Sequence, residues 1–263
     1  MSLFWRLHEG LPREGPGSDE STRSALRHVT GRLPHAPRIL DIGCGPGMQT
    51  LVLARETAGH VTAVDRHQPF LDELDRRAAR AGLTERITTV NASMSALDYP
   101  DAAFDLIWSE GAIYVMGFAE GLRAWKRLLK RDGVIAVTEV SWLGSKVPEE
   151  AASFWGRGYP AMTDVSTNLR TIESAGYALI DHFVLPESAW WDDYYAPLER
   201  RIEALKREYR DDQDAMAFLE GERTEISLYR KYAASYGYVF YVARNVGSSR
   251  EGEDVTVRGI GIE

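Results

Sequence analysis

Short runs rich in β-branched residues alternate with longer amphipathic stretches between residues 38 and 141. This alternation is typical of βαβ units, in which a helix connects two parallel strands of one sheet. The strands predicted here cover residues 38–44, 60–65, 87–93, 104–110 and 133–141, and the helices between them cover about 48–57, 69–81 and 117–130. The pattern therefore predicts an α/β fold with a parallel sheet.

The pattern is less regular after residue 141. A loop with a short helix is expected over 142–163, a helix over 165–175, and two further strands at 178–185 and 236–246. The segment 187–235 between those strands is too long for a hairpin turn. Its middle places Leu198, Ile202, Leu205 and Tyr209 on one helical face, so we expect a helical insertion folded over the sheet.

These elements predict four parts. Residues 1–30 form an N-terminal lid or helix segment, and residues 31–186 with 236–246 form the core. Residues 187–235 are expected to cap a substrate site, and 247–263 to form a mobile tail.

Composition narrows the function classes. The 263 residues include 44% hydrophobic and 27% charged residues, as in a globular protein. The formal net charge of -8 disfavours a nucleic-acid partner. No apolar run reaches the ~20 residues that cross a bilayer, and the first residues lack a leader pattern, so a cytoplasmic protein without membrane contact is expected. A single cysteine, Cys44, permits no internal disulfide and no cysteine-clustered metal site.

A glycine-rich loop follows the first predicted strand and has the sequence Asp41-Ile42-Gly43-Cys44-Gly45-Pro46-Gly47. Glycines at a strand-to-helix turn let the backbone approach a ligand closely. A phosphate-binding P-loop is excluded because no lysine follows the last glycine. The dinucleotide fingerprint would need glycine at position 48, where Met48 stands.

The remaining pattern, Asp-x-Gly-x-Gly-x-Gly, resembles the first motif of the class I S-adenosylmethionine-dependent methyltransferases. The strand VTAVD ends in Asp65, where that family has an acidic residue for the ribose hydroxyls, and residues 104–107 (FDLI) resemble a further family motif. The resemblance is greatest to the small-molecule branch that contains ubiquinone- and menaquinone-biosynthesis methyltransferases. It implies a Rossmann-like, doubly wound, seven-stranded and mostly parallel sheet with the helical insertion before the last strand.

The resemblance also implies which residues bind S-adenosylmethionine. Asn91 and Ser93 stand where the family most often has an acidic residue near the adenine, and Met94 offers a soft apolar surface to the ring. The full set of expected cofactor residues is Asp41, Gly43, Cys44, Gly45, Gly47, Asp65, Arg66, Asn91, Ser93, Met94 and Ser109.

The catalytic candidates lie after the fourth and fifth strands. Methyl transfer needs a positioned acceptor and a dry site, and a general base is optional. Glu110, Tyr114 and Glu139 are the candidates, and Glu110 is the first choice. A role in binding loop N–H groups is the alternative for Glu110, and His182 is expected to be an ordinary surface or core histidine.

Aromatic residues are densest where the insertion begins. Trp190, Trp191, Tyr194 and Tyr195, together with Trp142, are expected to bind the acceptor. The alternative is that these rings only pack the insertion against the sheet.

The sequence thus predicts a methyltransferase that moves a methyl group from S-adenosylmethionine to an O, N or C atom of a small molecule, leaving S-adenosylhomocysteine. The alternative is a non-catalytic protein that binds this cofactor and uses its insertion to hold a partner. An aminopropyl transferase is a third reading, although its paired acidic motif is absent. A homodimer stays open.

Overall fold

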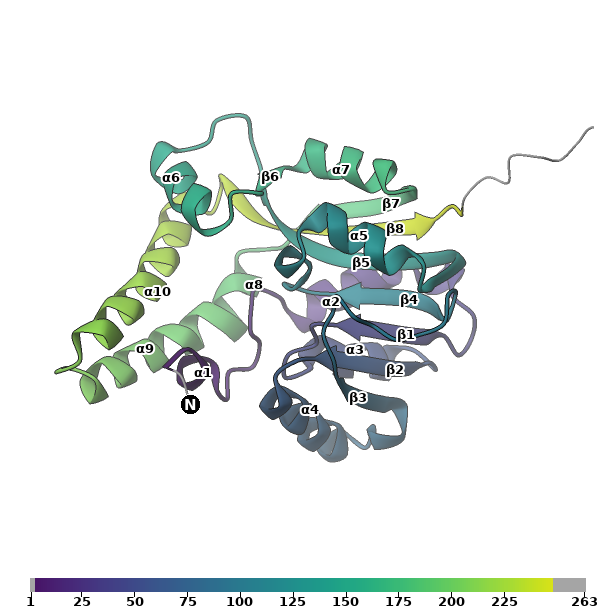
Figure 1. The fold of residues 1–263 in the computed structure, drawn as a ribbon, viewed down its shortest axis with the longest axis horizontal. Coiled ribbons are helices and arrows are strands. Elements are labelled where there is room, and N and C mark those ends of the chain that lie inside the picture. The colour runs from purple at the N-terminus through teal and green to yellow at the C-terminus, as the bar shows by residue number, and fades with distance from the viewer. Residues whose placement is uncertain (1–2, 248–263) are drawn as a thin grey trace, which may run out of the picture.

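One mixed β-sheet forms the centre of the computed structural model, which describes residues 3–247 (Figure 1). Its strands are β1 (Arg38–Ile42), β2 (His60–Asp65), β3 (Ile87–Asn91), β4 (Phe104–Ser109), β5 (Leu129–Trp142), β6 (Thr163–Asp164), β7 (Tyr177–Val184) and β8 (Tyr236–Asn245). Seven of them lie in the order β3-β2-β1-β4-β5-β8-β7, and the two-residue β6 pairs with β5. Strands β1 to β5 are mutually parallel, whereas β8 is antiparallel to β5 and β7. The predicted seven-stranded, mostly parallel sheet is confirmed.

Helices cover both faces of this sheet. One face packs against α2 (Asp19–Arg27), α3 (Met48–Glu56) and α4 (Gln68–Ala81), and the other packs against α5 (Phe118–Lys126) and α7 (Val165–Ser174). Neighbouring strand residues such as Ile39 and Leu40 belong to opposite cores, as the two-residue period of a strand requires. The result is a three-layer α/β/α arrangement.

The segment between β7 and β8 is helical. It contains α8 (Ser188–Trp190), the π-helical turn η4 (Trp191–Tyr195), α9 (Ala196–Glu208) and α10 (Gln213–Tyr232). Helices α9 and α10 lie beside each other to one side of the sheet, with α1 (Leu3–His8) next to α9 (Figure 1). Leu198, Ile202 and Leu205 are buried on the face that the sequence predicts. The remaining elements are α6 (Glu149–Gly158) and the 3-10 turns η1 (Thr30–Arg32), η2 (Thr84–Arg86) and η3 (Ile113–Val115).

Residues 3–18, named here the N-terminal segment, connect these helices to the sheet domain. Arg77 of α4 donates to the carbonyls of Leu11 and Pro12, at 3.2 and 2.9 Å. The amide of Gly17 donates to the carbonyl of Ala189 at 2.9 Å. The segment therefore bridges α4 and the insertion.

The prediction is wrong at the start of the fifth strand. The helix expected over 117–130 ends at Lys126, and β5 begins at Leu129, which pairs with Phe104. Asp132, at φ 62°, lies inside this strand together with Gly133, so the pair forms an irregularity within β5 and not a turn before it. The expected tail, from residue 248 onward, lies outside the described residues.

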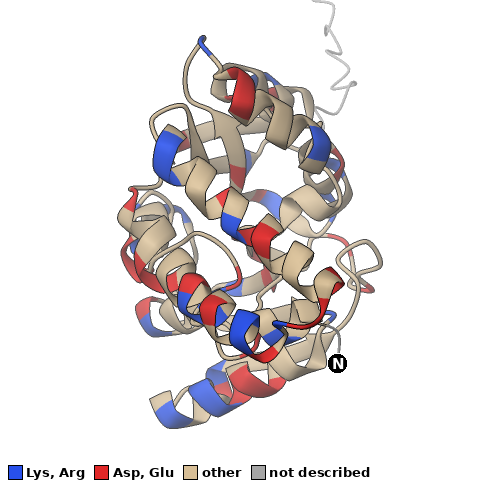
Figure 2. Ribbon diagram, turned by 90° about the vertical axis from the view of Figure 1, so that its left-hand side faces the viewer, with Lys and Arg blue, Asp and Glu red and all other residues tan. Residues whose placement is uncertain are grey.

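The outer face of α9 and α10 carries acidic and basic residues side by side (Figure 2). Within residues 3–247, no helix is both long and apolar enough to cross a membrane.

Candidate active site

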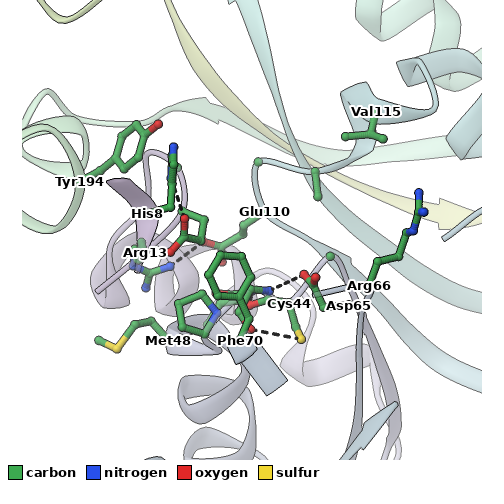
Figure 3. Close-up of a pocket in the computed structure, with 18 of the residues that line it drawn as sticks. His8, Arg13, Cys44, Met48, Asp65, Arg66, Phe70, Glu110, Val115 and Tyr194 are labelled. Carbon is green, nitrogen blue, oxygen red and sulfur yellow. Dashed lines mark hydrogen bonds and ion pairs between the residues drawn. The ribbon is translucent and has the colours of Figure 1, made fainter. Parts of the chain in front are cut away.

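A cavity of about 440 Å³ opens at the carboxyl ends of β1, β2 and β4, beneath the N-terminal segment and α10 (Figure 3). Three sequence signals meet there: the glycine loop after β1, Asp65 at the end of β2, and Glu110 after β4. We call it the main cavity. Its lining includes Phe4, His8, Arg13, Glu14, Gly43, Cys44, Gly45, Asp65, Arg66, Phe70, Ala92, Met94, Glu110, Tyr114, Tyr194, Glu222 and Glu225.

The glycine loop owes its shape to left-handed backbone conformations. Gly43, Gly45 and Gly47 have φ angles of 70°, 53° and 82°, which side chains other than hydrogen rarely allow. A Cβ atom on Gly43 would lie 2.4 Å from the Cβ of Ala112, and one on Gly47 would lie 2.2 Å from Leu74. The alternating glycines are therefore a steric requirement of this turn.

Asp65 holds the loop from the neighbouring strand. Its carboxylate accepts hydrogen bonds from the amide of Gly45 at 3.0 Å and from the amide of His67 at 2.9 Å. It is half-buried and lines the main cavity. A carboxylate offers about four acceptor positions, so about two of them stay available to a ligand.

Several expected cofactor residues lie behind the cavity wall. Asp41 is fully buried and accepts a 2.6 Å hydrogen bond from the hydroxyl of Thr50, and burial raises its pKa to about 7. The buried hydroxyl of Ser109 donates to the carbonyl of Ile42. Gly47 also does not line the cavity. Their contacts support the loop from below.

The third strand end differs in detail from the expectation. Ala92 and Met94 line the main cavity, whereas Asn91 and Ser93 do not. The Asn91 amide donates to Gln68 at 2.9 Å, and the Ser93 hydroxyl lies 2.8 Å from that of Ser95. All of these residues except Asn91 follow the end of β3, so their orientation is set by the loop and not by the strand period.

Two other expected cofactor residues do line the cavity. Cys44 is buried, and burial raises the pKa of its thiol well above the ordinary value, so it is not a reactive thiolate. Arg66 is exposed at the rim.

Glu110 reaches the cavity wall, but three donors already hold its carboxylate. The Thr22 hydroxyl donates at 2.7 Å, the Trp108 indole at 2.8 Å and the Arg13 guanidinium at 3.1 Å. Arg13 also contacts Asp19 at 3.1 Å, and the side chains of Arg13 and Glu110 are both 4% exposed. Glu110 thus forms a buried ion pair that fastens the N-terminal segment to the end of β4.

A second cavity, of about 250 Å³, adjoins the first and is named here the aromatic chamber. The two cavities share Glu14, Tyr114, Tyr194 and Glu225 among their lining residues. The rings that line the chamber are Tyr114, Phe154, Trp155, Tyr159, Trp190, Tyr194 and Tyr238. Figure 3 shows Tyr194 on the side of the main cavity opposite the glycine loop.

The aromatic residues at the start of the insertion therefore divide into two pairs. Trp190 and Tyr194 line a cavity, whereas Trp191 and Tyr195 line neither. The Trp191 ring lies under the guanidinium of Arg230, and Tyr195 is fully buried.

Two residues from the sheet also lie outside both linings. Trp142 packs edge-on against Tyr236, and His182 is exposed on β7.

Glu139 is buried in β5 and lines neither cavity. Burial raises its pKa to about 8, and the nearby hydroxyl of Tyr159 opposes part of that shift. Tyr114, by contrast, is 45% exposed and lines both cavities.

The wall of the main cavity is rich in carboxylates, one beside the glycine loop and two from α10: Glu14 lies next to Gly45, where an added Cβ would be 3.5 Å from Glu14 Cγ, and Glu222 and Glu225 come from α10. Burial raises the pKa of each, to about 7 for Glu225. His8 Nδ1 lies 2.7 Å from Glu14 Oε2, and the hydroxyl of Tyr195 donates to Glu225 at 2.9 Å.

Sequence reasoning did not find these residues, nor Phe4, Arg13 and Phe70. They come from the N-terminal segment, α4 and α10, and none belongs to a local motif. Arg13 meets Glu110 across a sequence separation of 97. The only local feature of the sequence that pointed to this side of the site was the length and aromatic content of the insertion.

Comparisons with known proteins agree with this geometry. A family model described as a methyltransferase domain matches residues 39–133. The 27-O-demethylrifamycin SV methyltransferase of Amycolatopsis mediterranei is 26% identical over 93% of this chain and 92% of its own. The dimethylglycine N-methyltransferase of Parasynechococcus marenigrum is 33% identical over 51% of this chain. The matched region covers about half of that relative, 49% of its length. A methyltransferase structure from Geobacter sulfurreducens, with S-adenosyl-L-homocysteine bound, has a TM-score of 0.76 at 21% identity, covering 92% of this chain and 96% of that one.

Proposed function

The chain is a class I S-adenosylmethionine-dependent methyltransferase, and from this premise we propose that the main cavity binds the cofactor and the aromatic chamber receives a small-molecule acceptor. The observation that carries the proposal is the connection between the two spaces. Asp65 and the glycine loop line one end of the main cavity, while Tyr194 and Glu225 line both the other end and the chamber. A cofactor held at the first end would present its reactive group toward the second.

The residues at the first end fit the cofactor. The two free acceptor positions on Asp65 match the two ribose hydroxyls in number. Met94, Ala92 and Phe70 supply apolar surface suited to an adenine ring. Gly43 and Gly45 leave the loop without side chains where a ligand would contact its backbone.

Bound S-adenosylmethionine supplies an electrophilic methyl group on a sulfonium. The chain's own contribution is to position the acceptor and to exclude water, since in-line displacement gains most from orientation. The Arg13–Glu110 ion pair keeps the N-terminal segment over the site. We therefore assign Glu110 a positioning role, while Tyr114 and Tyr194 are proposed to contact the acceptor.

Glu139 does not line the chamber, whereas its neighbour Tyr159 does. We therefore propose that Glu139 affects the acceptor only through Tyr159 and is not a base in contact with the acceptor. Asp41 and Ser109 are assigned to supporting the loop.

The relatives differ in acceptor: one is a methyltransferase of 27-O-demethylrifamycin SV, and another is an N-methyltransferase of dimethylglycine. They therefore do not select the methylated atom. The charge of -8 and the single cysteine support a cytoplasmic role without nucleic acid. A homodimer stays a prediction.

Calorimetry tests the cofactor assignment. Purified protein should bind S-adenosylmethionine and S-adenosylhomocysteine at one site per chain, in preference to NADH and ATP. Preference for NADH or ATP would contradict the proposal. Release of S-adenosylhomocysteine in the presence of an acceptor then measures transfer.

A further inference from the structure

The acceptor end of the site carries more negative than positive groups. Glu222 and Glu225 of α10 line the main cavity, and Glu225 also lines the chamber. Glu14 lines both cavities and lies next to Gly45. Arg66 is exposed where it lines the main cavity. The guanidinium of Arg13 is already bonded to Glu110 and Asp19. Among the described residues, no lysine or arginine lines the aromatic chamber.

From this arrangement, and resting on the function proposed above, we propose that the acceptor is an amine that enters the chamber as an ammonium ion, held by Glu225 and the surrounding rings. The carboxylate of Glu225 lines both cavities and uses one oxygen to accept from Tyr195. The other oxygen is available to an N–H donor. Tyr194, Trp190, Tyr159 and Tyr238 also line the chamber, and aromatic rings attract cations at their faces.

His8 supplies an independent observation. It is 5% exposed, lines the main cavity, and leaves Nε2 without a hydrogen-bond partner. In the form of this pair with an ionised Glu14 and a neutral His8, Nδ1 carries the hydrogen in their 2.7 Å contact and Nε2 keeps a lone pair. A buried lone pair beside a cavity needs a hydrogen-bond donor. An ammonium or a hydroxyl provides one, whereas a carbon acceptor does not.

The His8–Glu14 pair can also accept the proton that the ammonium must lose. An ammonium has no lone pair, so one N–H bond must break before the nitrogen can accept a methyl group. The proton passes to Nε2 of His8, where an N–H bond forms, and the electron pair stays on the amine. Glu14 stabilises the imidazolium that results.

Hydroxyl and carbon acceptors are the competing class, and the cofactor's own positive charges are a second explanation for the carboxylates. A matched pair of probes separates the classes. Benzylamine and benzyl alcohol share a ring and differ in carrying an ammonium or a neutral hydroxyl at neutral pH.

The first experiment titrates each probe into protein saturated with S-adenosylhomocysteine, followed by calorimetry. We expect benzylamine to bind about tenfold more tightly or better, the ratio that a hydrogen bond to a charged group supports. Equal affinities, tighter binding of the alcohol, or no binding of benzylamine at millimolar concentration would each overturn the proposal.

The second experiment uses Glu225→Gln, with Glu220→Gln as the control. Both residues lie on α10, but Glu220 is exposed and contacts Lys206 on the outer surface. Glu225→Gln should weaken benzylamine binding about tenfold or more and leave benzyl alcohol unchanged. Glu220→Gln should change neither. If Glu225→Gln does not fold, the first experiment, on the unaltered protein, decides the proposal.

The affinity for S-adenosylhomocysteine identifies which idea fails. Unchanged affinity in Glu225→Gln, with the loss confined to the amine, supports the proposal. An equal loss of cofactor and amine binding would mean that Glu225 serves the cofactor, and the amine assignment would fall. If the unaltered protein binds no S-adenosylhomocysteine, the proposed function itself has failed.

Discussion

Replacing Arg13 by methionine should destabilise the protein more than any other single substitution in the N-terminal segment. The guanidinium and its partner Glu110 are each 4% exposed, so the substitution leaves a buried carboxylate without its cation. Breaking a buried ion pair by removing one partner costs about 3–5 kcal/mol. Because Thr22 and Trp108 still donate to Glu110, we expect the lower end, about 3 kcal/mol.

Urea unfolding, followed by tryptophan fluorescence, measures this loss. Arg23→Met is the matched control, because Arg23 contacts Glu56 at 3.0 Å in an exposed pair and should cost at most about 1 kcal/mol. The double variant Arg13→Met/Glu110→Gln should lose less than the sum of its parts, since no buried charge remains. A loss from Arg13→Met no greater than that from Arg23→Met would refute the reasoning.

Three further substitutions test other parts of the site. Asp65→Ala should weaken S-adenosylhomocysteine binding about 10- to 150-fold, the range for hydrogen bonds to a charged group, and calorimetry on a folded variant with unchanged affinity would contradict the assignment. Gly43→Ala and Gly10→Ala both place a side chain at a positive φ, 70° and 77°, so each should cost about 1–2 kcal/mol in backbone strain. Only the Cβ at Gly43 also clashes, at 2.4 Å from Ala112, so only Gly43→Ala should abolish cofactor binding. Burial raises the pKa of Glu139 from 4.5 to about 8, so the folded protein holds a proton that the unfolded chain releases in that window. The free energy of unfolding should therefore fall as pH rises between those values, by up to about 4 kcal/mol, and Glu139→Gln should flatten the slope in urea unfolding at about pH 5 and pH 8; an unaltered slope would show that Glu139 is not responsible.

The parts of the molecule that the sequence predicts are those determined by local periodicity and turn chemistry. The strand ending at Asp65 and the alternating glycines are examples, because the conformation of each depends on its immediate neighbours. The start of β5 was missed because Asp132 and Gly133 look like a turn but lie within a strand.

The acceptor side was harder to predict for two reasons. His8, Glu14 and Glu225 come together only through tertiary packing, so no spacing in the sequence joins them. Tyr194 and Tyr195 lie in the π-helical turn η4. A π-helix bonds residue i to i+5, so the 3.6-residue period of an α-helix does not predict which of their side chains face the cavity.

The N-terminal segment also determines when, during synthesis, the site can exist. Its carbonyl at Glu9 accepts from Arg201, 192 residues later, and the cavity that it roofs needs Glu222 and Glu225 from α10. Closing so long a loop is entropically slow compared with pairing β1 to β5. A nascent chain can therefore assemble most of its parallel sheet on the ribosome while its roof still lacks a partner. The enclosed site requires α10, so a chain that stops before α10 would keep the glycine loop without the roof above it.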